Sequence, residues 1–216
     1  MTQATPLLRG WSHIAAIVPA ASAATALVLS GPRDAGQRAA LALYGAALIL
    51  LFTVSALYHR GPWSPRVRAV WRRVDHANIF LMIAATYTAA VVIILSGTTR
   101  IAVLLAVWIA ATTGIVLSVV PLRLPRAVYV LLYVITGWIA IVVLPAIVPR
   151  VSTTALIFML AGGAAYTLGA LVYGFRRPRL WPRVFGYHEV FHLLVIAASA
   201  LFFAFVALAA GPHARV

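Results

Sequence analysis

The sequence predicts an all-α, polytopic membrane protein with seven transmembrane helices, forming a single domain over residues 1–216. Hydrophobic residues make up 64% of the chain and charged residues only 9%, whereas charged side chains form about a quarter of a typical soluble domain. Apolar stretches of about 20 residues, enough for a helix to cross the hydrocarbon core, recur along the chain with only short polar breaks.

The first apolar stretch is interpreted as a retained span, because no compact basic region precedes it and no small-residue cleavage pattern follows. Prolines mark the connections between the later stretches, where a missing amide donor costs little. The second predicted span ends at His59, and the third begins at Asp75. Within a few residues, the seven spans are expected at residues 10–29, 39–59, 75–95, 101–120, 126–147, 152–173 and 187–210.

The net charge of +14 comes from 17 basic residues, all of them arginine and nearly all between the apolar stretches. This placement indicates topology signals rather than a nucleic-acid partner. Twelve arginines fall on the N-terminal side of the predicted bundle and five on the opposite side, namely Arg33, Arg38, Arg100, Arg150 and Arg215. The positive-inside rule therefore predicts a cytoplasmic N-terminus and an outside C-terminus. The partners expected for such a multi-pass protein are membrane lipids.

The chain has no cysteine, so any transition metal must be held by imidazole or carboxylate groups. His59 ends the second span, while Asp75 and His188 begin the third and seventh, which places all three in the cytoplasmic leaflet. His188 and His192 are four residues apart and share one helix face, with His192 about 6 Å deeper. Ionisable groups at membrane depth are costly unless paired or metal-bound. We therefore predict a zinc site with His59, His188 and His192 as ligands.

Three imidazoles and a water molecule form the open tetrahedral zinc site typical of hydrolases. Asp75 could be a fourth ligand or could hold the water, and Ser55, one helical turn before His59, could hydrogen-bond a ligand or that water. The bound water would have a pKa of about 7 and supply a hydroxide nucleophile. Asp75 also has a simpler interpretation, as a cap of the third helix or a partner of Arg72 or Arg73.

The remaining ionisable residues are expected to lie outside the site. We expect His13 to be a packed residue near the membrane interface, His76 to face away from the side of the helix that carries Asp75, Asp34 to lie in an external loop and His213 to lie in the tail.

The segment from His188 to His192 also matches the H-E-x-x-H pattern, in which a glutamate acts as the general base of a metalloprotease. Glu189 lies about 100° around the helix from His188. The spacing therefore leaves an intramembrane metalloprotease open as an alternative.

The chain resembles the bacterial hemolysin III family, within the superfamily of the progestin and adipoQ receptors, over essentially its whole length. The resemblance rests on Ser55-Ala-Leu-Tyr-His59, on Val74-Asp75-His76-Ala-Asn-Ile-Phe with Ala85-Thr-Tyr-Thr88, and on Phe185-Gly-Tyr-His188-Glu-Val-Phe-His192. It departs from the family pattern at Ala89, where proline is frequent and a kink could be altered, and at Phe202, where many members carry a further histidine.

The resemblance implies a seven-helix protein of the bacterial inner membrane, with zinc on His59, His188 and His192 and with Asp75 beside the bound water. It also implies kinship with alkaline ceramidases, and hence hydrolysis of an amide- or ester-linked lipid, or lipid sensing, in membrane homeostasis. A lytic effect on erythrocytes gave the family its name. A pore-forming or cytolytic protein without catalysis, and a receptor-like scaffold with a structural metal, remain alternatives.

Overall fold

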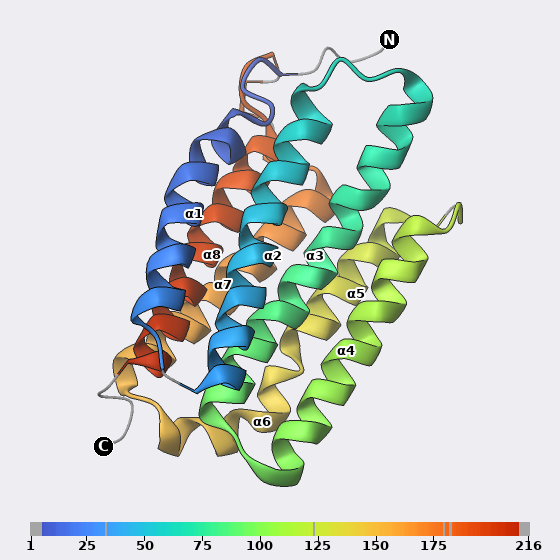
Figure 1. Cartoon of the computed structure of the whole chain (residues 1–216). Helices are drawn as coiled ribbons and strands as arrows, with labels where there is room; N and C mark the ends of the chain where they lie inside the picture. The colour runs from blue at the N-terminus through green and yellow to red at the C-terminus, as the bar shows by residue number, and fades with distance from the viewer. Residues whose placement is uncertain (1–5, 33, 123, 179, 182, 212–216) are drawn as a thin grey trace.

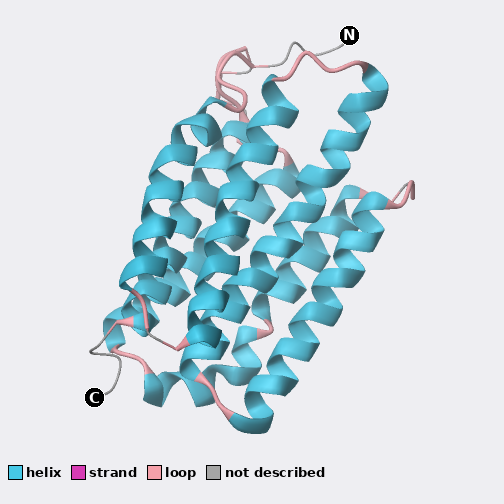
Figure 2. Cartoon of the chain, in the orientation of Figure 1, coloured by secondary structure: helices cyan, strands magenta, loops and turns pink. Residues whose placement is uncertain are grey.

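The computed structural model describes residues 6–32, 34–122, 124–178, 180–181 and 183–211. Over these residues the chain forms a bundle of roughly parallel helices (Figure 1), and most loops lie at the two ends of the bundle (Figure 2). Seven helical segments of the described part are long and apolar enough to cross a membrane. The predicted all-α, seven-span fold is therefore confirmed.

Six spans are single helices and the fifth is divided. In chain order the elements are α1 (Trp11–Ser30), α2 (Ala35–Arg60), α3 (Pro65–Ile94), α4 (Gly97–Val119), α5 (Arg126–Trp138), α6 (Ala140–Ile147), the short 3₁₀ helix η1 (Val148–Arg150), α7 (Thr153–Phe175) and α8 (Tyr187–Ala210).

The helices α1 to α4 pack each against the next along the chain, and α7 packs along α8. The last helix, α8, also contacts α1 and α3, while α5 contacts α7, α4 and α3. Helix α1 begins and α8 ends at opposite ends of the bundle (Figure 1), as an odd number of crossings requires. The end of α2 and the start of α8 therefore meet at one end of the bundle.

Helix α3 differs from its predicted boundaries, because it starts at Pro65, ten residues before the predicted start of the span at Asp75. Ser64 caps this extension by accepting a hydrogen bond from the Val67 amide, and Pro65 occupies the first turn, where its missing N–H is not needed. The extension is rich in arginine. A prediction based on apolar stretches therefore does not include it in the helix. Asp75 consequently lies inside α3, where it cannot cap the helix.

The fifth span is broken at Ile139, between α5 and α6. The amide of Ala140 donates to the Tyr87 hydroxyl at 2.6 Å, and that hydroxyl donates to the Gly137 carbonyl at 2.7 Å. Unsatisfied backbone groups cost several kcal/mol in the hydrocarbon region. A side chain from α3 therefore stabilises the break in the neighbouring span.

Small residues allow the helices to approach closely in the centre of the bundle. Ala84, Ala85 and Ala89 of α3 are fully buried, and a Cβ atom on Gly114 of α4 would lie 2.3 Å from the Phe80 ring. Small residues at contacts are typical of packed membrane helices. Helix α3 runs unbroken past Ala89 to Ile94, so alanine rather than proline at this position goes with a continuous helix.

Candidate metal centre

His188 and His192 lie on the first two turns of α8, with their ring centroids 4.5 Å apart. The predicted sharing of one helix face is thus confirmed. His192 is the more enclosed of the two, at 1% exposure. One of its ring nitrogens, Nδ1, is buried and has no hydrogen-bond partner among the described residues. A buried polar atom without a partner is costly, and both ring nitrogens of the neighbouring His13 are in the same state.

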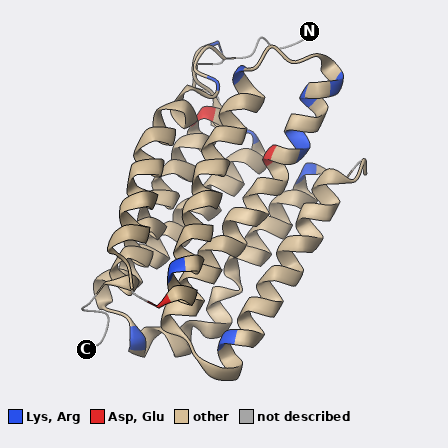
Figure 3. Cartoon of the chain, viewed as in Figure 1, with Lys and Arg blue, Asp and Glu red and all other residues tan. Residues whose placement is uncertain are grey.

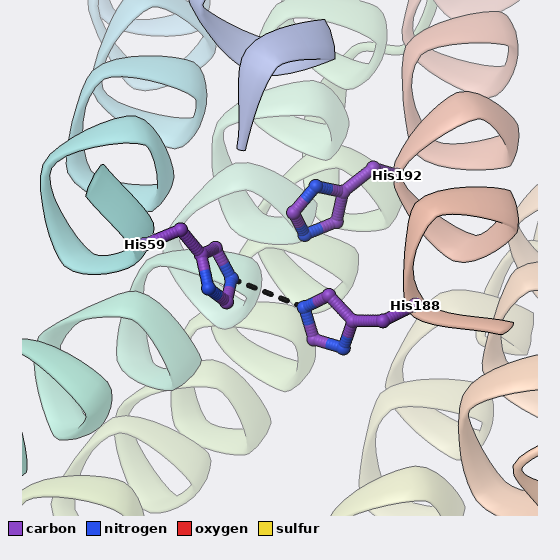
Figure 4. A group of neighbouring side chains, drawn as sticks. All are labelled: His59, His188 and His192. Atoms are coloured by element: carbon purple, nitrogen blue, oxygen red, sulfur yellow. Dashed lines mark hydrogen bonds between the residues drawn. The ribbon is translucent and has the colours of Figure 1, made fainter. Parts of the chain in front are cut away.

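His59 completes the cluster from the last turn of α2. Its Nε2 lies 3.0 Å from the Nε2 of His188, and one ligand nitrogen from each of the three histidines lies within 4.8 Å of the others. Figure 4 shows the three rings gathered between the two helices. Imidazole nitrogens are common zinc ligands, and these three are close enough together to be shared by one ion. The structure therefore brings together all three predicted histidine ligands, and their donor set fits a metal ion.

Asp75 lines the same cavity as His59 and His188, but its carboxyl group lies outside the three-histidine cluster. The buried Ser55 on α2 lies next to Asp75. The ion pair recorded among the described residues joins Arg9 to Glu189, so pairing of Asp75 with Arg72 or Arg73 is not observed. The structure thus places Ser55 beside Asp75, whereas the sequence had suggested a ligand or its water as the partner of Ser55.

Glu189, the middle residue of the H-E-x-x-H segment, has both carboxylate oxygens occupied. Oε1 accepts from Nε of Arg9, and Oε2 accepts from the Gly186 amide at 2.7 Å. The residue is 3% exposed and does not line the cavity. The hydrogen bonds of Glu189 therefore connect the start of α8 with the segment before α1. A general base would instead face the space in which a substrate binds.

His13 is packed, as the sequence predicted, but its contact with His192 was not predicted. It is 2% exposed, and its ring lies parallel to that of His192 with centroids 4.0 Å apart and an interplanar angle of 15°. The lone pairs of stacked rings lie in parallel planes, so the two rings cannot both direct a nitrogen at one ion. The only sequence signal was the position of His13 near the same end of the bundle.

His76 lies on the cavity wall despite its predicted orientation away from the face of Asp75. Its Nε2 is 3.3 Å from the hydroxyl of Tyr173 on α7. Asp34 caps α2 by accepting from the Gln37 amide at 2.8 Å, which fits its exclusion from the site. His213 lies outside the described residues.

The histidine cluster opens onto a cavity of about 1000 Å³, at the upper end of the range for small-molecule sites. His59, Asp75 and His188 lie on its polar wall, and the cavity continues between the helices to Phe202 and Phe205. Its lining is predominantly apolar. The arrangement can hold a metal next to a carboxylate and accept a long apolar ligand beside both.

The family model described as Haemolysin-III related matches residues 1–203. The chain belongs to the haemolysin-III related family. It is 31% identical to "Hemolysin-3" of Bacillus cereus over 164 residues, covering 76% of this chain and 72% of that protein. It is 26% identical to "Hemolysin-3 homolog" of Bacillus subtilis (strain 168) over 161 residues, covering 74% and 72%. With its seven candidate spans, this haemolysin-III related protein is a multi-pass bacterial membrane protein.

Phe202, the residue where the sequence departs from many haemolysin III members, has a defined place in this protein. It lines the cavity and stacks on Tyr166, with ring centroids 5.7 Å apart and an interplanar angle of 29°. A Cβ atom on Gly162 of α7 would lie 2.7 Å from its ring. Phe202, ten residues after His192 on α8, therefore extends the apolar part of the cavity.

Proposed function

We propose that this protein is a zinc-dependent membrane hydrolase that cleaves an amide- or ester-linked lipid. The observation that carries the proposal is the cluster of three imidazoles from two helices, within 4.8 Å of one another. Two of them, His59 and His188, line a cavity of about 1000 Å³ with a mainly apolar lining. Three neutral imidazoles suit zinc and leave a coordination position open. The long apolar cavity suits an acyl chain.

His59, His188 and His192 would hold the metal, which when bound supplies a Lewis acid and a coordinated water with a pKa of about 7. The Asp75 carboxylate would orient the attacking water, accept its proton and return that proton to the leaving amine or alcohol. Ser55 would position Asp75 through its hydroxyl. The apolar walls around Phe202 would hold the acyl chain and exclude bulk water.

We further propose that the centre faces the cytoplasm. Arg38 and Arg100 lie in the first turns of α2 and α4, and Arg150 ends η1, which places all three at the end of the bundle opposite the histidines. Figure 3 shows most of the blue residues towards the other end, where α1 begins. Excess arginine marks the cytoplasmic side. Because the chain has no cysteine, one cysteine introduced at Arg66 or at Arg100 can be tested with an impermeant thiol reagent. Labelling of the cysteine at position 66 from outside intact cells would show that the protein has the opposite orientation.

The test of the proposed activity uses the purified full-length protein, with metal content and lipid hydrolysis measured on the same samples. We expect one zinc per chain, and its loss in the double variant His188→Ala, His192→Ala. Asp75→Asn should retain zinc and lower turnover by about 100-fold or more, as expected for removal of an acid–base group. Asp34→Asn is the matched control, because it makes the same chemical change at a helix cap, where asparagine serves as well as aspartate.

Sub-stoichiometric zinc in fresh preparations, or zinc retained by the double histidine variant, would defeat the proposal. Unfolding of His59→Ala combined with unchanged properties of Asp75→Asn would indicate a structural metal in a receptor-like scaffold. Ion conductance in liposomes that survives metal chelation would favour a pore-forming protein. Hydrolysis of a peptide rather than a lipid would favour an intramembrane metalloprotease.

A further inference from the structure

A second group of polar side chains lies on the cavity wall, next to the histidine cluster and contributed by three other helices. The guanidinium of Arg126 on α5 lies 4.5 Å from the ring centroid of Tyr173 on α7, and its Nη1 donates to the Tyr173 carbonyl at 3.1 Å. The Tyr173 hydroxyl is 3.3 Å from Nε2 of His76 on α3. These contacts fix the guanidinium of Arg126 at the cavity, unlike a freely solvated surface arginine.

This part of the cavity wall carries more positive than negative charge. Arg72, Arg73 and Arg126 all line the cavity, and none of them forms an ion pair within the described part of the chain. Arg9 also lines the cavity, but Glu189 neutralises it. Asp75 is the one acid among the lining residues. A guanidinium beside an apolar cavity is stabilised by an anion that accepts its hydrogen bonds.

Topology alone does not account for this placement. Arg66, in the first turn of α3, is exposed and does not line the cavity, as expected for an arginine that only marks the cytoplasmic side. Arg126 is half-buried and is held by contacts with a helix 47 residues further along the chain. The Tyr173 ring that holds it also contacts His188, with ring centroids 5.9 Å apart. The arginines and two of the candidate metal ligands, His59 and His188, therefore border one continuous space.

We propose that the cavity binds an anionic lipid, whose phosphate or carboxylate group is held by Arg126 and Arg72 beside His76 and Tyr173. The acyl chain of this lipid lies along the apolar lining towards Phe202 and Phe205. The inference rests on the proposed function, because it names the class of lipid that the hydrolytic site takes. It requires only the cavity and its arginines, so headgroup preference can be measured without turnover.

The experiment measures displacement of a fluorescent-tailed phosphatidylglycerol from the purified full-length protein in a neutral detergent. The competitors are phosphatidylglycerol, phosphatidylcholine with the same chains, a long-chain fatty acid and inorganic phosphate. We expect phosphatidylglycerol or the fatty acid to compete at least about tenfold more strongly than phosphatidylcholine, a difference of about 1.4 kcal/mol. Inorganic phosphate in the millimolar range should not compete, because it lacks the acyl chain.

Arg126→Gln and Arg72→Gln should each weaken binding of the anionic lipid by about tenfold. Binding of phosphatidylcholine should weaken by less, because its choline cation offsets the charge of its phosphate. Arg66→Gln is the matched control and should bind as the unaltered protein does. Arg72 is exposed and makes no side-chain hydrogen bond in the described structure, so its replacement tests the inference even if Arg126→Gln does not fold. Melting temperature and zinc content are recorded for every variant.

Equal competition by phosphatidylglycerol, the fatty acid and phosphatidylcholine would overturn the inference, as would unchanged binding in Arg72→Gln. Displacement of the probe by inorganic phosphate as effectively as by phosphatidylglycerol would also overturn it, by showing a site for a free anion. Measuring zinc content, turnover and headgroup preference on the unaltered protein separates the two proposals. Headgroup preference without zinc or turnover refutes only the hydrolase, whereas zinc and turnover without headgroup preference refute only the anionic lipid.

Discussion

The imidazole ring of His13 lies flat against that of His192, with 4.0 Å between the ring centroids. This contact joins α1 to the helix that supplies two of the three candidate metal ligands. His13 also packs on Phe52 of α2. The ring of His13 therefore fills the space behind His192 and restricts its orientation.

His13→Ala should lower zinc affinity by about tenfold, as is typical for loss of a group that orients a metal ligand. His13→Phe keeps a flat ring in the same place and should retain most of the affinity. Both are measured by competition with a zinc chelator. Leu27→Ala, at the other end of α1 and equally part of its buried face, serves as the control. If His13→Phe lost zinc as completely as His192→Ala, His13 would be a ligand.

Glu189→Gln should destabilise the protein by about 3 kcal/mol, because it leaves the Arg9 guanidinium without its carboxylate at a largely buried site. Zinc content should not change, since Glu189 lies outside the ligand cluster. The measurement is the free energy of unfolding in a denaturing detergent. The double variant Arg9→Gln, Glu189→Gln should recover part of the loss. A fall in hydrolysis at unchanged stability would instead assign Glu189 the role of a general base.

Tyr87→Phe should cost about 1–3 kcal/mol, because it leaves the Ala140 amide and the Gly137 carbonyl without their partner. The effect should be local and should appear as faster amide hydrogen exchange around residues 137–141. Tyr133→Phe is the comparison, since its hydroxyl makes only a long hydrogen bond of 3.4 Å to the His76 carbonyl. Equal exchange in the two variants would contradict the role assigned to Tyr87.

Gly114→Ala should destabilise the packing of α3 against α4 by about 1–3 kcal/mol, as expected when an atom is forced into a filled space. The added methyl group would lie 2.3 Å from the Phe80 ring. Gly163→Ala places the same group where nothing lies within 4 Å, so it should be neutral or slightly stabilising. Thermal unfolding of the two variants provides the comparison, and equal melting temperatures would be inconsistent with it.

The seven spans and the grouping of the three histidines could be predicted from the sequence. Apolar length determines the spans, and helical periodicity together with membrane depth places His188 and His192 on one face, level with His59. The start of α3 was missed because its first turns are rich in arginine, although Ser64 and Pro65 form a recognisable helix start.

The contacts of His13 and His76 depend on how the helices are rotated against one another. That rotation is determined by many side chains packed between elements distant in the sequence, such as the pairing of His76 with Tyr173, 97 residues away. Spacing within one helix carries no information on such contacts. The same reason explains why Ser55 lies beside Asp75 on the adjacent helix.

His59 precedes His188 by 129 positions, so more than half of the chain separates it from the other two candidate ligands. During synthesis, the second span enters the membrane long before the seventh has been made. Until α8 is in place, His59 has neither of its partner imidazoles. Metal uptake at this centre would therefore follow insertion of the last of the seven spans, and would distinguish finished molecules from incomplete ones.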